Sequence, residues 1–200
     1  MEPKVIQISI HHKKPKKMKS LFFTLVVLFF SLSLSAQIEV YGRYTKGGSI
    51  EPDINFYGSK KISQSWKVTY FALVESTWSE ALIGLTYVPN DWLEIGLSSG
   101  VEHNPAICRF ASNLWIGKNN TSLTVLLEKG SGSDNYWYKT DVSEKLSEKF
   151  TVGLMAWRFH GVGPMVKFTP AKSLTYWIYP TYDFEYKAQR LSIGVDIPIQ

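Results

Sequence analysis

Residues 37–200 alternate between apolar and polar side chains in short segments that turn-forming residues separate. In the last segment, Leu191, Ile193 and Val195 alternate with Ser192 and Gly194. A period of two residues is typical of a β-strand that turns one apolar face and one polar face to different surroundings. No part of this region has a convincing helical period. The chain is therefore expected to be all-β.

Turn chemistry divides the region into strands. Short breaks such as Pro89-Asn90-Asp91, Lys118-Asn119-Asn120 and Pro170-Ala171-Lys172 alternate with a second set of somewhat longer breaks. The pattern predicts twelve strands, at 37–46, 53–61, 66–76, 80–88, 91–101, 106–116, 120–130, 134–142, 149–159, 163–169, 173–183 and 189–199. Ten strands remain an alternative if 53–61 or 163–169 is miscounted, and eight is the lowest count considered.

A secretion signal precedes this region. Residues 18–36 read MKSLFFTLVVLFFSLSLSA, with lysines first, an apolar stretch next and small residues last, which is the order of a cleaved signal peptide. The apolar run is too short for a membrane-spanning helix, which needs about 20 residues. We expect cleavage after Ala36, with Ser35 as a second possible site. Residues 1–17 are expected to be an upstream extension ahead of a true start at Met18, or else a long basic n-region.

The net charge of +5 comes from the leader. Six of the 22 Lys and Arg residues lie in the first 19 positions, whereas 16 basic and 16 acidic side chains follow from Gln37 onward. Nucleic-acid binding requires a clustered basic surface, so this class of function is not expected. The single cysteine, Cys108, excludes an internal disulfide framework.

Strand number and side-chain type favour a membrane barrel over a soluble one. Eight strands already give an interior that side chains just fill, so a barrel of ten or twelve strands is expected to enclose water. The polar face carries small residues beside ten charges, which are predicted to line the lumen: Glu39, Arg43, Lys67, Glu94, Arg109, Glu128, Lys139, Asp141, Lys167 and Asp196. Six aromatics near strand ends are predicted to lie at the membrane interfaces: Trp66, Trp78, Tyr87, Trp92, Trp115 and Trp137.

With turns such as TYVPNDWLEIG and FTPAKSLTYWIY, the pattern resembles bacterial outer-membrane β-barrels across residues 37–200. The resemblance implies an antiparallel up-and-down barrel in the outer membrane of a Gram-negative bacterium, surrounded by outer-membrane lipid and inserted by the barrel assembly machinery. The ending SLSLSAQ resembles signal peptides of Bacteroidota. The chain ends in Ile199-Gln200, whereas many such barrels end in an aromatic residue. A secreted soluble β-sandwich or barrel is the alternative fold.

The search for catalytic chemistry yields only one weak pattern. His103 and His160 fall in the longer set of breaks, and Ser98, Ser99 and Ser112 lie within plausible reach of His103. A nucleophile, base and orienting group must lie within hydrogen-bond distance, and no signature surrounds these residues. Both histidines are therefore expected to be exposed loop residues, with no catalytic, metal or cofactor site.

The charges predicted for the lumen leave two functions open. They could line a small non-specific channel, whose near balance of signs implies weak ion selectivity, or they could neutralise one another in a closed structural barrel. Contact between Arg109 and Glu128 across the lumen would indicate the closed form. An envelope-lipid hydrolase with His103 as base is the further alternative. The sequence does not indicate an oligomeric state.

Overall fold

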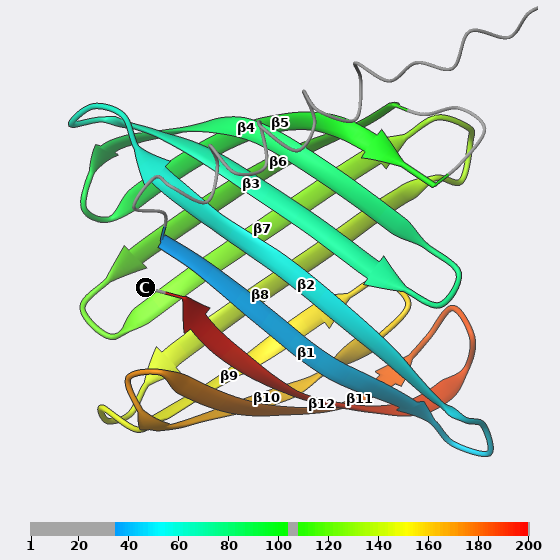
Figure 1. Cartoon of the computed structure of the whole chain (residues 1–200). Coiled ribbons are helices and arrows are strands. Elements are labelled where there is room, and N and C mark those ends of the chain that lie inside the picture. The colour runs from blue at the N-terminus through cyan, green and yellow to red at the C-terminus, as the bar shows by residue number, and fades with distance from the viewer. Residues whose placement is uncertain (1–34, 104–107, 200) are drawn as a thin grey trace, which may run out of the picture. The chain divides into compact units, whose positions relative to one another are not determined.

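The computed structural model describes residues 35–103 and 108–199, which form one closed antiparallel sheet of twelve strands (Figure 1). The strands are β1 (Ser35–Thr45), β2 (Ile50–Lys61), β3 (Trp66–Glu75), β4 (Ser79–Asn90), β5 (Leu93–Glu102), β6 (Cys108–Lys118), β7 (Thr121–Gly130), β8 (Tyr136–Lys145), β9 (Phe150–Trp157), β10 (Gly161–Ala171), β11 (Leu174–Asp183) and β12 (Ala188–Ile199). Each strand pairs with its neighbours in sequence, and β1 pairs with β12 to close the barrel. Among the described residues, no helix is long and apolar enough to cross a membrane.

The prediction of about twelve strands in an up-and-down barrel is confirmed. The two segments that left ten strands open are complete strands, β2 and β10, and both are longer than predicted. The proposed extension 1–17 and most of the proposed signal peptide 18–36 lie outside the described residues, so both stay predictions. Ser35 and Ala36, at the end of the predicted signal, form the start of β1.

The barrel has two distinct ends. The end where β1 begins and β12 finishes, called the terminal end below, carries the turns 62–65, 91–92, 119–120, 146–149 and 172–173. The opposite end, called the loop end, carries the connections 46–49, 76–78, 103–107, 131–135, 158–160 and 184–187. These are the two sets of breaks that the sequence predicted to alternate.

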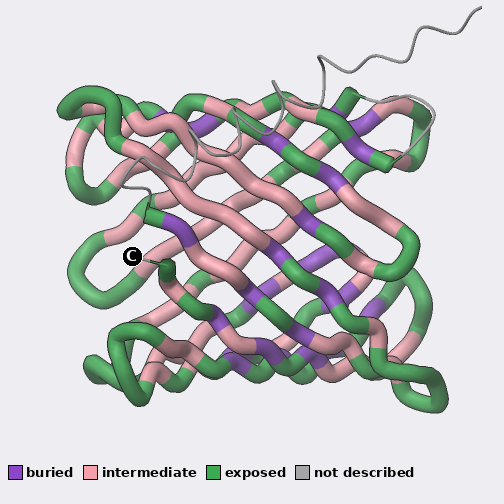
Figure 2. Tube along the Cα trace, viewed as in Figure 1, coloured by how far each residue is buried: buried purple, intermediate pink, exposed green. Residues whose placement is uncertain are grey.

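Apolar side chains face outward from this barrel. Leu97 is 70% exposed and Ile193 is 53% exposed, whereas Ser192, the neighbour of Ile193, is fully buried. Ile95 is also exposed, and Leu93 and Val195 are only half-buried. In β4, β11 and β12, buried positions recur at every second residue with more exposed ones between them, and the tube in Figure 2 is banded accordingly on several strands. The apolar face is not packed into an enclosed core, which is the arrangement of a membrane barrel and not of a soluble one.

One inward-facing apolar cluster does exist, and it occupies one side of the wall. Its members come from β1, β9, β10 and β11, with Trp137 of β8 packed against them: Tyr41, Met155, Trp157, Met165, Trp177 and Tyr179. A glycine makes room for it, because a Cβ on Gly194 would lie 2.4 Å from the Trp177 ring. The cluster thickens part of the wall, and three of its members, Tyr41, Met155 and Trp157, border the space that remains inside.

A charge placed on the outer face tests this orientation. Leu97 lies in the middle of β5, so Leu97→Arg is expected to lower the free energy of unfolding in lipid vesicles by about 2–4 kcal/mol, the penalty of arginine at the bilayer midplane. Leu146 is similarly exposed but lies in a turn at the terminal end. Leu146→Arg is therefore the control, with a loss of about 0–1 kcal/mol. Equal losses in urea titrations would contradict the outward assignment of Leu97.

Candidate channel lumen

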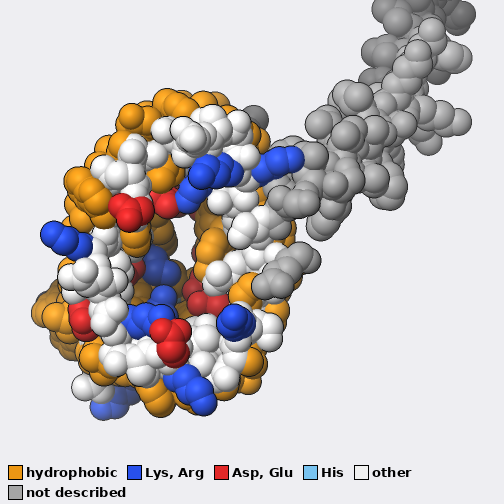
Figure 3. Space-filling view, turned by 90° about the vertical axis from the view of Figure 1, so that its left-hand side faces the viewer, with side chains coloured by type: hydrophobic (Ala, Val, Ile, Leu, Met, Phe, Trp, Pro, Cys, Tyr) orange, Lys and Arg blue, Asp and Glu red, His pale blue; other side chains and the backbone are white. Residues whose placement is uncertain are grey.

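A cavity of about 1220 Å³ runs through the inside of the barrel. Its lining includes Ser35 and Pro198 near the terminal end and Thr77, Asn135 and Tyr186 at the loop end. In Figure 3, which looks into the terminal end, the barrel is hollow, acidic and basic side chains line the opening, and hydrophobic side chains cover the outside. The lumen is thus the one large space that the described residues enclose.

The structure brings nine of the ten charges named from the sequence to this cavity. The lining contains Glu39, Arg43, Glu94, Arg109, Glu128, Lys139, Asp141, Lys167 and Asp196. The tenth, Lys67, does not line the cavity, but its Nζ lies 2.6 Å from Glu94 Oε1 near the terminal end. Alternation explains this grouping, because all ten occupy the inward parity of their strands.

Arg109 and Glu128 meet along the wall and not across the lumen. Arg109 on β6 donates from Nε to Glu128 Oε2 on the adjacent strand β7, at 2.6 Å. Arg43 of β1 likewise donates from Nε to Glu51 of the neighbouring strand β2, at 2.8 Å. Ion pairs between adjacent strands leave the centre of the barrel free, whereas pairs between opposite walls would fill it.

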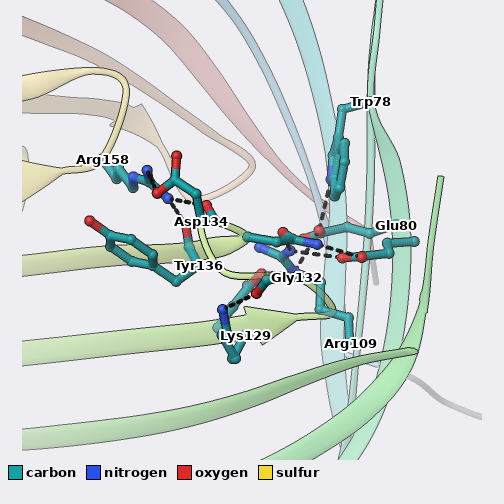
Figure 4. Close-up of polar contacts among 11 residues, drawn as sticks. Trp78, Glu80, Arg109, Lys129, Gly132, Asp134, Tyr136 and Arg158 are labelled. Carbon is teal, nitrogen blue, oxygen red and sulfur yellow. Dashed lines mark hydrogen bonds and ion pairs between the residues drawn. The ribbon is translucent and has the colours of Figure 1, made fainter. Parts of the chain in front are cut away.

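Arg109 is the centre of the largest charge group in the lumen. Besides Glu128, its guanidinium lies 2.9 Å from Glu80 Oε2 and donates to Glu102 Oε2 at 2.9 Å. Its Nη1 also donates to the side chain of Asn135. The arrangement around Glu80, Arg109 and Trp78 is drawn in Figure 4, where the Trp78 indole donates to Glu80 at 2.9 Å.

Glu80 and Glu102 were not among the residues singled out in the sequence. Both stand at strand ends beside predicted loops, at the start of β4 and the end of β5. Their place in the alternation of inward and outward residues is the signal that could have identified them. Glu80, for example, is two residues before Leu82, so the two side chains lie on the same face, and both Glu80 and Leu82 are buried.

A second arginine ties the loops of the loop end together. Arg158, in the connection between β9 and β10, donates to Asp134 Oδ1 at 2.9 Å and lies 3.5 Å from Glu185 Oε1. Its guanidinium also lies 3.7 Å from the centroid of the Tyr136 ring. Figure 4 shows this contact beside the Arg109 group. Three separate connections are thereby held by one buried cation, which sequence spacing does not reveal.

Carboxylates and a lysine share the rest of the wall, with Lys139 and Trp157 close to the loop end. Asn55 donates to Glu39 at 2.6 Å, and Trp177 donates from Nε1 to Asp196 at 3.3 Å. Glu39 and Asp196 are register partners across β1 and β12. Lys139 lies 4.1 Å from the centroid of the Trp157 ring, a distance suited to a cation–π contact.

The expectation of two exposed histidines is half right. His103 is exposed, but His160 is buried and stacks on Trp157, with ring centroids 3.5 Å apart and planes 10° apart. The connection 158–160 is only three residues long and turns inward through Phe159, which has a positive φ of 67°. The ring of His160 is carried into the barrel as a result, and burial, with the positive charge of Arg43, lowers its pKa well below the ordinary value.

Three of the six aromatics predicted for the membrane interfaces line the cavity instead. Trp78, Trp115 and Trp137 face inward, and alternation is again the reason. Trp115 follows Arg109 by six residues on β6, and Trp137 precedes Lys139 by two on β8, so each shares the parity of a lumen charge. The others are exposed, namely Trp66, Tyr87 and Trp92. Trp66 and Tyr87 lie together near the terminal end, with centroids 5.0 Å apart.

The geometry around His103 contains no triad among the described residues. Its backbone N–H donates to Ser79 O at 2.7 Å, and its ring makes no hydrogen bond to a described serine or carboxylate. Glu102, the adjacent carboxylate, is held by Arg109 and by Asn135, which donates to its Oε1 at 2.6 Å. Within the described ranges, no group of three or more His, Cys, Asp and Glu side chains could hold a metal ion.

Removal of Arg109 tests the role of its charge group. Arg109→Ala leaves the carboxylates of Glu80, Glu102 and Glu128 together in a buried site without their cation. We expect a loss of about 3–5 kcal/mol in the free energy of unfolding, as for a broken buried ion pair. The control is Lys145→Ala, because Lys145 and its partner Glu148 are both exposed, and its expected loss is about 0–1 kcal/mol. Urea titration in detergent micelles measures both, and equal losses would contradict the assigned burial.

The buried imidazole gives a second expectation. Because the pKa of His160 is lowered in the folded state, the unfolded chain binds the proton first as the pH falls through 6.5. This contribution to stability is therefore present above that pH and is lost on acidification. His160→Phe keeps a ring on Trp157 but cannot titrate, so its free energy of unfolding should fall less on acidification than that of the parent protein. His103→Phe serves as the exposed control, and a parallel response of both variants would refute the expectation.

No protein-family model matches the chain, and no curated protein sequence matches it. Solved structures with the same fold do exist. The KdgM porin has a TM-score of 0.57 at 9% identity, with 82% of this chain and 99% of that chain covered. The NanC porin has a TM-score of 0.55 at 10% identity, with coverage of 81% and 100%.

A third neighbour is the outer membrane protein Omp33 of Acinetobacter baumannii, with a TM-score of 0.53 at 9% identity and coverage of 83% and 98%. Identities this low establish the architecture alone. The chain shares the twelve-stranded β-barrel fold of outer-membrane porins.

Proposed function

We propose that residues 37–200 form a porin-like channel for small hydrophilic solutes in the outer membrane of a Gram-negative bacterium. The observation that carries the proposal is the continuous cavity, whose lining reaches both ends of a barrel with an apolar exterior. Such a surface suits outer-membrane lipid as its solvent, and the barrel assembly machinery would insert it. The signal peptide predicted at 18–36 supplies the export step.

The placement of the ion pairs favours an open lumen over a structural plug. The ion pairs of Arg43 and Arg109 join strands that are adjacent or one strand apart along the wall. Arg43 alone reaches farther, donating from Nη1 to the Phe159 carbonyl at the loop end at 3.1 Å. A cavity of about 1220 Å³ spread over an apolar band about 25 Å tall has a mean cross-section of roughly 50 Å². This width admits water and small solutes and excludes folded polypeptide.

The lipid-hydrolase alternative has little support. Among the described residues, His103 has no orienting carboxylate, because Glu102 is already bound by Arg109 and Asn135. A general base needs such geometry before its pKa matters. The structural neighbours are porins. The cavity runs along the inside of the barrel as a path for solutes, whereas a hydrolase needs a cleft that holds its lipid substrate.

A bulky residue inside the lumen tests transport directly. Ala111 lines the cavity, whereas the adjacent Phe110 is 62% exposed on the outside. Ala111→Trp is expected to lower the single-channel conductance in planar bilayers by at least about half, because conduction follows pore width. Phe110→Trp introduces the same side chain on the outer face and should leave the conductance unchanged.

Two outcomes would contradict the proposal. A folded protein, shown by faster gel migration before heating than after, that carries no current would indicate a closed structural barrel. Equal conductance of the two tryptophan variants would mean that the current does not pass through this lumen. Unchanged lipid turnover in a His103→Ala variant would dismiss the hydrolase independently.

A further inference from the structure

Carboxylates crowd one section of the lumen at the loop end. They come from strands β2, β3, β4, β5 and β7, and all six lie within three residues of the strand end there. We call this group the acidic arc, consisting of Glu51, Asp53, Glu75, Glu80, Glu102 and Glu128. Four of the six line the cavity, whereas Asp53 and Glu102 are buried and do not line it. The basic side chains among them are Arg43 of β1 and Arg109 of β6. The arc thus contains six carboxyl groups against two guanidinium groups.

Sheet stability does not account for this arrangement. Asp53 lies directly opposite Glu75 in the register of β2 and β3, and Glu80 lies directly opposite Glu102 in the register of β4 and β5. Like charges directly opposite one another destabilise a sheet. Arg109 bridges Glu80 and Glu102, whereas no cation bridges Asp53 and Glu75 among the described residues. The second pair therefore points to a role other than stability.

The two arginines compensate only part of the charge. Arg109 contacts Glu80, Glu102 and Glu128 at once, so three carboxylates share one cation. Arg43 is held by Glu51 and by the carbonyl of Phe159. Among the described residues, no Lys or Arg forms an ion pair with Asp53 or Glu75, and Asp53 Oδ2 is buried without a hydrogen-bond partner.

The rest of the lining does not offset the arc. At the loop end, Arg158 is paired with Asp134 and Glu185, and Arg190 lies 3.1 Å from Asp183. Lys139, the fourth residue of β8, is one further cation at the loop end, where it lies over the Trp157 ring. Lys167, Glu39, Asp141 and Asp196 line the cavity farther toward the terminal end. The whole lining contains nine acidic residues, Glu39, Glu51, Glu75, Glu80, Glu94, Glu128, Asp134, Asp141 and Asp196, and six basic ones, Arg43, Arg109, Lys139, Arg158, Lys167 and Arg190.

From these observations we infer that the channel selects small cations over anions, and that the acidic arc at the loop end is its selectivity filter. The inference rests on the channel proposed above. Rings of Asp and Glu select cations in pores, and low-dielectric walls focus the field of such charges into the aqueous path. The near balance of 16 acidic and 16 basic side chains after Gln37 hides this excess, because several lysines, such as Lys60, Lys118 and Lys172, lie at the terminal end outside the lining.

The acidic arc also implies that this lumen admits a different class of solute from that of one structural neighbour. The KdgM porin has been captured in complex with disordered oligogalacturonate, a chain of anionic sugars. An uncompensated arc of carboxylates repels such a polyanion at short range. Shared architecture at 10% identity therefore does not extend to a shared solute.

The reversal potential across a planar bilayer with a KCl gradient tests the inference. The parent protein should pass K⁺ in preference to Cl⁻. The variants Glu51→Gln and Glu75→Gln should each lower the cation-to-anion permeability ratio by about twofold, the effect of one unit charge about 10 Å from the ion path in dilute salt. Glu75→Lys should lower the ratio further than Glu75→Gln.

The control variant is Glu144→Gln, which removes a carboxylate at the terminal end outside the cavity lining and should leave the ratio unchanged. Every variant is first checked for heat-modifiable migration, so that folding is established separately. A conducting parent protein with no preference for K⁺ would overturn the filter while leaving the channel intact. Absence of any current would overturn both. A ratio that responds equally to Glu75→Gln and Glu144→Gln would place the selectivity elsewhere.

Discussion

Closure of the sheet is the constraint from which the other features follow. Hydrocarbon offers no hydrogen bonds to a backbone, so every strand in a bilayer must be paired on both sides. Here the pairing of β1 with β12, from Ala36 opposite Ile199 to Thr45 opposite Arg190, removes the last free edge. Once the sheet is closed, each side chain can point only outward or into the interior of the barrel. Apolar side chains take the lipid side, and charged ones must share the interior.

The two sides of the barrel interior accommodate these side chains differently. On the side of β1 and β9–β11, the tyrosine, tryptophan and methionine side chains of the inner cluster pack against the wall. On the side of β2–β7, polar and charged residues border the open space. Charged residues nevertheless reach the lumen from both sides, because Lys139 and Asp141 of β8, Lys167 of β10 and Asp196 of β12 also line it.

The sequence predicted the elements of this fold well and their interior contacts poorly. Period-two alternation identified all twelve strands and assigned Arg109 and Glu128 to the same face, since parity is a local property of each strand. It could not show that Glu80 and Glu102 complete the group around Arg109, because that depends on the register of β4, β5 and β6. Register between strands is determined by turns and packing, which the alternation does not encode.

The aromatic residues show the same limit to what the alternation can predict. A tryptophan near a strand end fits the pattern of a membrane interface whichever way its side chain points. Position along the strand therefore placed Trp78, Trp115 and Trp137 at the interfaces. The alternation of inward and outward residues would have predicted that they line the lumen, as they do. His160 differs, because its burial depends on the three-residue turn 158–160 and the left-handed backbone of Phe159. Turn conformation of this kind follows from the tertiary contacts of Arg158 and could not be derived from spacing.

The connections at the loop end are three to five residues long, and Arg158 fastens three of them to one another. No described segment is therefore long enough to fold back into the barrel as a movable constriction. The narrow part of the passage must be built from side chains anchored on hydrogen-bonded strands, which do not swing on a hinge. The channel proposed above would therefore have a fixed bore, and in the course of evolution its permeability would change by exchange of single wall residues and not by remodelling of loops.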